Sequence, residues 1–333
     1  MSIVYIRFAA RRFAARQRSP LLERLVAGAS GSARVLDWRA EALRVIAPVA
    51  QRLPSVAAGA LSAANLHAPA AAASSAAPSG VWGCIATPVH LSAGMNSVMM
   101  PQDGLLELSR EEAEALAGDF NRVFAGAGTR LQVARGAILV CVFDQAFEVT
   151  THDPEAVMGR DVFAFQPTGI DAPRLRRQMT EMEMWLFDHA VNRARARNAS
   201  KPVTGFWLWG GGAMDSVPAV LDIAIALRSA APSVRAWTAG RDPFFAAFGE
   251  QTQFPRGTGP GVVVCVAQPG SEMWPEVEQR WLAPALAALR SGKIRRVDLS
   301  AAERRFTVGR APNLRFWRRP QPWWQSFETA DRE

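Results

Sequence analysis

The sequence predicts an α/β protein, with a mostly parallel sheet flanked by helices and a small inserted α+β subdomain. Strand-like and helix-like segments alternate in the N-terminal and C-terminal parts of the chain, which indicates an α/β layer architecture. The run GVVVCVAQ is rich in β-branched residues, as in a buried strand of a parallel sheet. Between these two parts, residues 81–171 hold short strands around one helix, which predicts the inserted subdomain.

The N-terminal part is expected to hold one strand and two helices. IVYIRF at residues 3–8 is the first strand. PLLERLVA at Pro20–Ala27 has proline in its first turn and helically spaced leucines, so it predicts a helix. Residues 36–53 are also predicted to be helical. Residues 55–80 are small and nearly uncharged, which predicts a linker or a long surface loop.

The insert, residues 81–171, contains the clearest helix signal. Ser109 is the expected N-cap, and Glu112 three residues later completes a capping box. Leu116, Phe120, Val123 and Phe124 follow with the spacing of a buried stripe. The segments VWGCIATPVHLS, SVMMP, RLQVA, AILVCVF and FEVTT are expected to form strands, and the first two of them to pair with each other.

The C-terminal part is expected to return to the α/β core. Residues 172–198 are predicted as one long helix beginning near Pro173, and GFWLW at residues 205–209 as a strand. Helices are expected at residues 216–230, in DPFFAAFG and at residues 275–291. VRAWTAG is expected to be a strand or a turn, and KIRRVDLSA and RRFTVGR to pair as edge strands. The core then comprises residues 1–54 and 172–320, followed by a C-terminal tail at residues 321–333.

The charge of the chain is uneven along its 333 residues. Residues 1–50 hold nine arginines and three acids, and residues 290–333 hold eleven Lys and Arg and five acids. Each end therefore has a net charge of +6, and because the whole chain has +8 the middle has −4. The basic ends can neutralise the acidic middle, which we favour, or form a patch for an anionic partner.

Three cysteines, Cys84, Cys141 and Cys265, lie far apart in apolar surroundings. This spacing favours buried free thiols in a reducing cytoplasm over disulfides or a thiolate metal site. No apolar run is long enough to span a bilayer, so we expect a cytoplasmic protein without a membrane partner.

The stretch WLWGGGAMD supplies the first candidate site. Glycines after a strand can present backbone N–H groups to a phosphate, which makes Gly210, Gly211 and Gly212 candidates for an anion site. However, the stretch lacks both the GxGxxG spacing and the lysine of a P-loop. Close packing of a strand and a helix explains the glycines equally well.

The second candidate is a polar helix face. Trp185, His189, Asn192 and Arg193 share one face at helical spacing, which suits either a polar site in a cleft or a helix end that holds the following loop. We favour the second interpretation because a lone histidine is usually structural. Thr87 and His90 are further candidates in the insert.

The sequence predicts no catalytic residue, metal site or cofactor. The four histidines form neither HxxxH nor HxH, and no GxSxG is present.

The C-terminal stretch LRFWRRPQPWWQSF interleaves arginine with aromatic residues. Such a pattern suits single-stranded nucleic acid or a membrane interface. It also suits a segment that docks on the core through Trp317, Trp323 and Trp324. We favour docking, because terminal segments stay ordered only when they are held to the rest of the fold.

Several long motifs together carry a resemblance to a known family. VWGCIATPVHL, LSREEAEALAGDFNRVF, GRDVFAFQPTG, EMEMWLFDHAVNRARARNASKPVTGFWLWGGG and LRFWRRP resemble the RpfE-type regulatory proteins of proteobacteria, in order over residues 80–320. This family is in turn distantly similar to the archaeal-type cofactor-independent phosphoglycerate mutases of the alkaline phosphatase superfamily. The resemblance implies an alkaline-phosphatase-like core.

The resemblance to the mutases also implies metal-coordinating residues that are not found in this sequence. Such a mutase needs two metal ions and a Ser or Thr that accepts the phosphoryl group. One metal-binding Asp follows its first strand, where Arg7 and Phe8 stand here. An Asp-Glu-Ala-Gly-His cluster follows a late strand, where Gln268 and Pro269 stand here. Because these positions lack the carboxylates and histidine that would hold two divalent ions, the chemistry is expected to be lost.

We therefore expect a non-catalytic regulatory or binding protein on a degenerate phosphoglycerate-mutase-like fold, whose partner is an unknown protein or a small anionic ligand. One alternative is a mutase-like or phosphatase-like enzyme with a rearranged site that uses His189 and Arg193. The other is a nucleic-acid-binding regulator that uses the basic termini, for which no recognised DNA-binding motif is present.

Overall fold

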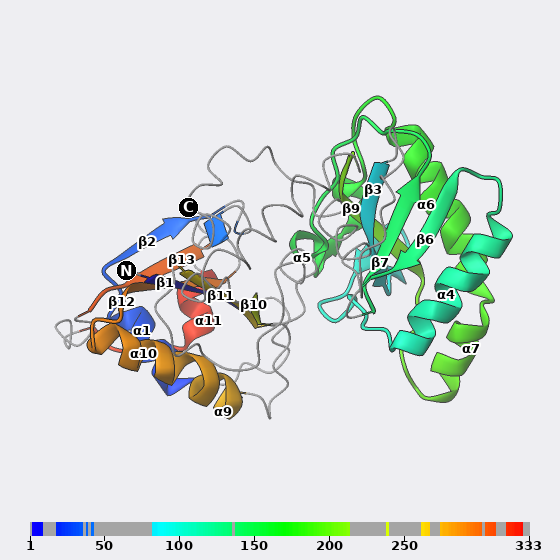
Figure 1. The fold of residues 1–333 in the computed structure, drawn as a ribbon. Coiled ribbons are helices and arrows are strands. Elements are labelled where there is room, and N and C mark those ends of the chain that lie inside the picture. Colours follow the sequence, from blue (N-terminus) through cyan, green and yellow to red (C-terminus); the bar gives the residue numbers. More distant parts are fainter. Residues whose placement is uncertain are drawn as a thin grey trace, which may run out of the picture. The chain divides into compact units, whose positions relative to one another are not determined.

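The computed structural model describes residues 2–8, 18–35, 38, 41–42, 82–134, 137–213, 238–239, 261–266, 274–301, 304–310 and 318–328. The chain divides into two compact units (Figure 1). Unit 1 combines Met1–Ser55 with Ile223–Glu333, and unit 2 is Val56–Asp222. The α/β class expected from the sequence is confirmed. The alkaline-phosphatase-like form of the sheet stays an expectation.

Unit 1 is built on a six-stranded sheet with the order β10-β11-β1-β12-β13-β2. The first four strands are parallel: β10 (Thr238–Ala239), β11 (Gly261–Val266), β1 (Ser2–Phe8) and β12 (Ile294–Ala301). Two antiparallel strands follow, β13 (Arg304–Val308) and β2 (Gly31–Arg34). β12 and β13 pair as expected, but the prediction that both are edge strands was wrong. β12 lies between β1 and β13, and β13 is covered by β2, a strand that the sequence analysis missed.

Short helices pack on this sheet. They are α1 (Pro20–Ala27), α9 (Trp274–Val277), the π-helical segment η7 (Glu278–Leu282), α10 (Ala283–Arg290) and α11 (Trp323–Glu328). α1 begins where expected because the Ser19 hydroxyl accepts a hydrogen bond from the Leu22 N–H and proline occupies the first turn. Trp323 and Phe327 are completely or almost completely buried in the same core as Phe8 and Leu22, so this part of the tail docks as predicted.

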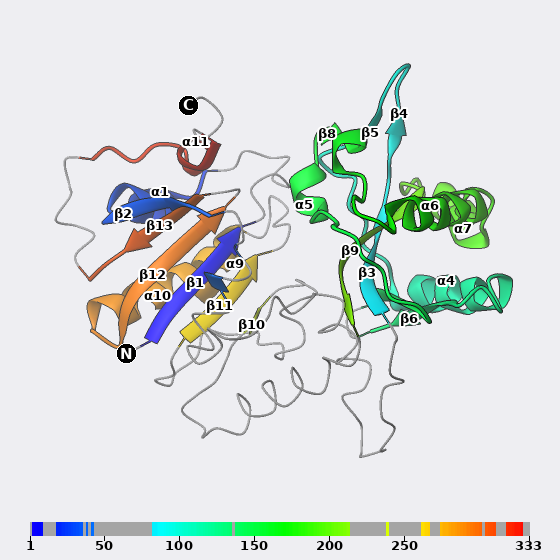
Figure 2. The ribbon, with the colours of Figure 1, turned by 90° about the horizontal axis from the view of Figure 1, so that it is seen from above.

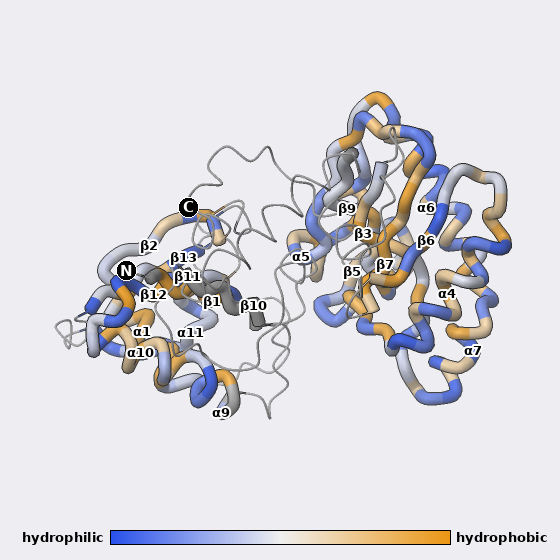
Figure 3. Tube along the Cα trace, viewed as in Figure 1, coloured by the Kyte–Doolittle hydropathy of each residue, from blue (hydrophilic) through white to orange (hydrophobic). Residues whose placement is uncertain are grey.

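Unit 2 is built on a four-stranded antiparallel sheet with the order β6-β7-β3-β9. Its strands are β6 (Thr129–Val133), β7 (Leu139–Phe143), β3 (Trp82–Val89) and β9 (Gly205–Ala213). α4 (Arg110–Val123) and α6 (Ala172–Phe187) lie on the same side of this sheet (Figure 2). Leu116 and Phe120 of α4, Met182 of α6 and Cys141 of β7 share one core. In Figure 3, hydrophobic residues recur along β7, whereas α4, α6 and α7 carry many hydrophilic residues.

The rest of unit 2 consists of short elements. α7 (Ala190–Arg197) follows α6. A three-stranded sheet joins β4 (Ser92–Ala93), β5 (Val98–Met100) and β8 (Arg160–Asp161), next to α5 (Pro154–Val157) and the 3-10 helix η4 (Val162–Phe165). SVMMP thus pairs with the end of VWGCIATPVHLS, through Ser92 and Met99, as expected. FEVTT is not a strand, and only Thr150 forms a bridge, with Thr168.

Two predictions for residues 172–213 differ from the structure. The predicted core began at residue 172, but β9 pairs with β3 and α6 packs on the same sheet, so these elements belong to unit 2. The predicted single helix over residues 172–198 is two helices, α6 and α7, separated at Asp188 and His189. The linker at 55–80, the helices at 216–230 and in DPFFAAFG, Trp317, and almost all of the helix at 36–53 lie outside the described residues.

Candidate functional site

His189 is the N-cap of α7, and both nitrogens of its ring have hydrogen-bond partners. Its Nδ1 accepts the N–H of Val191 at 3.2 Å, and its Nε2 lies 3.2 Å from Oδ2 of Asp119 on α4. Because Nδ1 acts as an acceptor, the neutral ring carries its proton on Nε2 and donates it to Asp119. Burial lowers the pKa of His189, and the Asp119 carboxylate opposes this shift. His189 is thus held as a neutral cap, and its ring contacts Trp185 at 4.7 Å between centroids.

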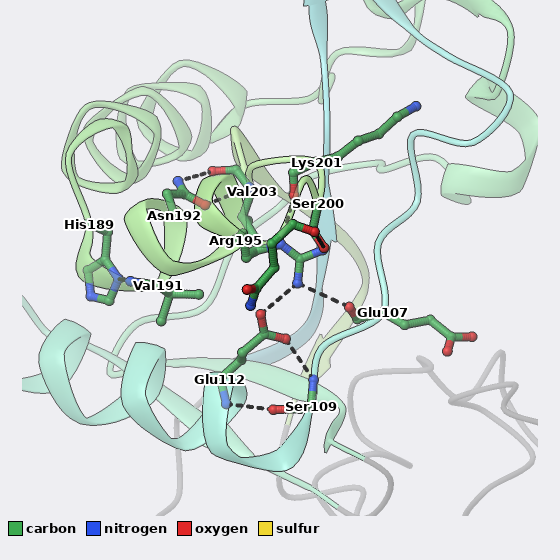
Figure 4. A network of polar contacts seen from close by, with 11 residues as sticks. Glu107, Ser109, Glu112, His189, Val191, Asn192, Arg195, Ser200, Lys201 and Val203 are labelled. Atoms are coloured by element: carbon green, nitrogen blue, oxygen red, sulfur yellow. Dashed lines mark hydrogen bonds and ion pairs between the residues drawn. The ribbon is translucent and has the colours of Figure 1, made fainter.

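Asn192 is buried and fixes the chain on both sides of α7 (Figure 4). Its amide nitrogen donates to the carbonyl oxygens of Leu186 and Val203, at 2.7 and 2.8 Å, and its amide oxygen accepts the N–H of Val203 at 2.8 Å. This side chain therefore joins the end of α6 to the segment that enters β9. Arg193, in contrast, is 56% exposed and donates to the carbonyl and the carboxylate of Asp188.

Arg195 completes this network, and the sequence analysis did not single it out. Its side chain is only 10% exposed. Nη1 lies 2.8 Å from Oε1 of Glu112, and Nε donates to the carbonyl of Lys201 at 2.7 Å (Figure 4). Glu112 also closes the predicted capping box, since Oε2 accepts the Ser109 N–H at 2.8 Å and its own N–H donates to the Ser109 hydroxyl at 3.1 Å. One glutamate therefore caps α4 and anchors α7.

The three candidate glycines lie within a strand, so the prediction that the strand ends at residue 209 and the glycines follow it was wrong. β9 continues to Ala213. Gly83 pairs with Gly212 and Ile85 with Trp209, so β9 contains one residue more than β3 between these two pairs, which forms a β-bulge. Gly210 has φ of +64°, a conformation that glycine adopts without strain. A Cβ on Gly211 would come within 1.8 Å of the Trp82 ring, so the missing side chain makes room for this indole.

The structure does not bring all the candidate residues into one site. Val203, which Asn192 binds, precedes β9, whereas the glycines occupy its far end, and the five residue steps from Gly205 to Gly210 span roughly 16 Å. Thr87 accepts a hydrogen bond from the Trp209 indole at 2.8 Å. His90 donates from Nδ1 to the carbonyl of Pro202, at 3.1 Å. Each of these contacts connects neighbouring segments of unit 2.

A different polar group lies in unit 1, at the carboxyl ends of the parallel strands. Arg7 is the penultimate residue of β1 and only 7% exposed. Its Nη1 donates to the hydroxyl of Ser300 on β12 at 3.2 Å, and its guanidinium lies 4.9 Å from the centroid of the Trp38 ring. Open α/β sheets bind their ligands at this edge. In the sequence, Arg7 was noted only because it stands where the resembling mutases have a metal-binding Asp.

Two properties of the described residues bear on metal binding and on membrane insertion. Among these residues, no group of three or more His, Cys, Asp or Glu side chains is close enough to hold a metal ion. None of the described helices is long and apolar enough to cross a membrane.

Comparisons with known proteins place the chain only loosely. No protein-family model matches it, and no curated protein does. Among solved structures it is similar to the cofactor-independent phosphoglycerate mutase from Thermoplasma acidophilum, with 14% identity over 92% of this chain and 89% of that chain and a TM-score of 0.35. It is also similar to a protein from Pyrococcus horikoshii, with 10% identity over 92% and 87% of the two chains and a TM-score of 0.38.

Proposed function

We propose that this chain is a non-catalytic binding or regulatory protein, on a scaffold of phosphoglycerate-mutase type that has lost metal-dependent phosphoryl transfer. The partner is a protein or a small anionic ligand. The observation that carries the proposal is the buried cation Arg7 at the carboxyl end of β1, where a mutase of the resembling type needs a metal-binding carboxylate.

The register of the sheet supports this interpretation. β1 and β11 are parallel neighbours, with Phe8 opposite Val266, so the two strands end side by side. The resemblance places the two sets of metal ligands after these strands. In the sequence, Arg7 and Phe8 occupy the first position, and Gln268 and Pro269 follow the second strand. Both positions therefore lack the carboxylates and histidines that a divalent ion prefers.

Electrostatics argue in the same direction. A guanidinium stays charged at every physiological pH, and its repulsion of a divalent cation a few ångströms away amounts to several kcal/mol in a partly desolvated site. Arg7 is held in place by Ser300 and by the face of Trp38. This edge of the sheet is therefore better suited to an anion than to a metal ion.

The decisive experiment is a mutase assay of the purified full chain with 2- and 3-phosphoglycerate, with Mn²⁺ or with excess chelator. Circular dichroism of the same sample shows that the protein is folded. We expect no interconversion above background under either condition, and no Mn²⁺ retained in equilibrium dialysis. Turnover that requires Mn²⁺ and disappears with the chelator overturns the proposal in favour of an enzyme with a rearranged site.

A further inference from the structure

The two basic ends of the sequence come together in one folded unit. Unit 1 takes the N-terminal and the C-terminal segments and holds 26 Lys and Arg against 13 Asp and Glu, a net charge of +13. Unit 2 holds 12 against 17, a net charge of −5. The strongly positive net charge of unit 1 points to an anionic partner of this unit.

Part of this charge gathers at the end of unit 1 where β12 begins, a region that we call the basic edge. Arg290 ends α10, and Lys293 and Arg295 flank the first residue of β12. Arg310 follows β13, which runs antiparallel to β12, and its Nη2 donates to the carbonyl of Gly292 at 3.3 Å. Figure 2 shows the end of α10 beside the start of β12.

Two more arginines extend the basic edge past β13 to the start of β2. Arg318 donates to the carbonyl of Ala29 at 3.3 Å, and the next residue, Ser30, donates its N–H to the carbonyl of Thr307. Arg319 follows directly. All six cations of the basic edge are exposed, namely Arg290, Lys293, Arg295, Arg310, Arg318 and Arg319.

The described acids of unit 1 are engaged elsewhere. Glu23 binds Arg18, and Glu41 binds Arg305. Glu278 accepts hydrogen bonds from the Ser19 hydroxyl and the Leu21 N–H. Asp298 is completely buried and is held by Arg296 and Thr307. Within the described side chains, the basic edge therefore keeps its positive charge.

We propose that the basic edge binds the phosphate backbone of nucleic acid, without reading its sequence. Five of the six cations are arginines, whose planar forks match phosphate oxygens. The cations are spread along an exposed strand end, which suits an extended polyanion better than a small enclosed one. Nucleic acid would be a second partner, in addition to the protein or small anionic ligand of the proposed function, because the basic edge lies at the opposite end of β12 from Arg7 and Ser300. The inference rests on the proposed function only in that it assumes a binding protein.

The test is a fluorescence-anisotropy titration of the full chain with a labelled 30-base-pair DNA duplex between 50 and 200 mM KCl. One variant carries Arg290→Gln, Lys293→Gln and Arg295→Gln. A matched control carries Arg176→Gln, Arg177→Gln and Arg197→Gln in unit 2. These three arginines are also exposed, so both variants lose three positive charges. Polyglutamate serves as a competitor of different chemistry, and circular dichroism shows that both variants are folded.

We expect the wild-type chain to bind the duplex with an affinity that falls steeply as salt rises. The edge variant should bind at least about tenfold more weakly at 50 mM KCl, with a log–log salt slope smaller by about two to three, because about 0.9 of a counterion is released for each neutralised phosphate. The control should change affinity by less than about twofold, since its cations lie outside the contact.

Four results overturn the inference: no binding at 50 mM KCl, salt-independent binding, equal weakening in both variants, or competition by polyglutamate as strong as by unlabelled DNA. The last result would identify an acidic protein as the partner. None of these results changes the expected outcome of the mutase assay, so the failures of the two proposals are distinguishable.

Discussion

His189 shows how one side chain links protonation to the start of a helix. Its Nδ1 accepts a backbone N–H, so protonating this nitrogen turns the acceptor into a donor and breaks the cap. Asp119 faces Nε2 and is itself bound by Arg122, while Arg193 is the nearby cation that disfavours a charged ring. An N-cap contributes about 1 kcal/mol to stability.

We predict that unit 2 loses stability when the pH falls from 7 to 5, partly through His189. Burial lowers its folded pKa below the unfolded value, so the unfolded chain binds the proton more readily and stability decreases as pH drops through the unfolded pKa. The His189→Asn variant keeps a capping acceptor but has no titrating group. Urea unfolding at both pH values should show a smaller loss for the variant. An equal loss in both proteins would rule out His189 as the titrating group.

Gly211 offers a second test at the scale of single residues. Gly211→Ala forces a Cβ against the ring of Trp82, and we expect a loss of about 1–3 kcal/mol from overpacking. Gly118→Ala is the matched control, because nothing lies within 4 Å of the added methyl group on α4. The control should gain about 0.5–1 kcal/mol from the better helix former. A lower thermal unfolding temperature for Gly211→Ala and a higher one for Gly118→Ala would support this packing role. An unchanged unfolding temperature for Gly211→Ala would contradict it.

At the scale of elements, α4 and α7 are joined through Glu112 and Arg195. The sequence predicted the capping box because its residues are three positions apart in one helix. It did not predict that Arg195 is the partner of Glu112, because the repeat RARAR contains three arginines, each separated from the next by one alanine. Only the position of α4 next to α7 makes the middle one a buried partner, whereas Arg193 stays exposed.

We expect Arg195→Met to lower the free energy of unfolding by about 2 kcal/mol. Removing one partner of a fully buried ion pair costs about 3–5 kcal/mol, and the cost is smaller here because the Glu112 side chain is 27% exposed. Glu112→Gln retains a residue suited to the capping box but removes the charge. The double variant should therefore cost less than the sum of the two single variants. The control is Arg110→Met in the exposed pair Arg110–Glu114, which should cost less than about 0.5 kcal/mol. Strict additivity would show that the two side chains are not coupled.

For the whole molecule, the main finding is two units with separate cores. One core surrounds Phe8 and Trp323, and the other surrounds Phe120 and Cys141. Cys84 and Cys141 face each other across β3 and β7 as buried free thiols, as the sequence predicted, while the Cys265 side chain lies outside the described residues. Burial raises the pKa of Cys84 well above its ordinary value, with a further contribution from Cys141.

This organisation predicts two unfolding transitions in urea rather than one. Cys84 and Cys141 should resist alkylation until unit 2 unfolds, because both burial and the raised pKa of Cys84 suppress the reactive thiolate. Mass spectrometry of chain labelled at each urea concentration identifies the modified cysteines. Gly211→Ala should shift the transition that exposes these two thiols and leave the other unchanged. If a single transition exposes every cysteine and shifts as a whole, the units unfold together.

The sequence by itself determined the features that depend on nearby residues. Local spacing and side-chain shape account for the capping box at Ser109, for the start of α1 at a proline, and for the strands β1 and β11. Only the tertiary structure decided which strand β9 joins, that a helix restarts at His189, and that the two basic ends form one unit. The reason is physical: pairing, burial and net charge of a unit depend on residues more than a hundred positions apart, such as Val89 and Thr204 or Arg7 and Ser300.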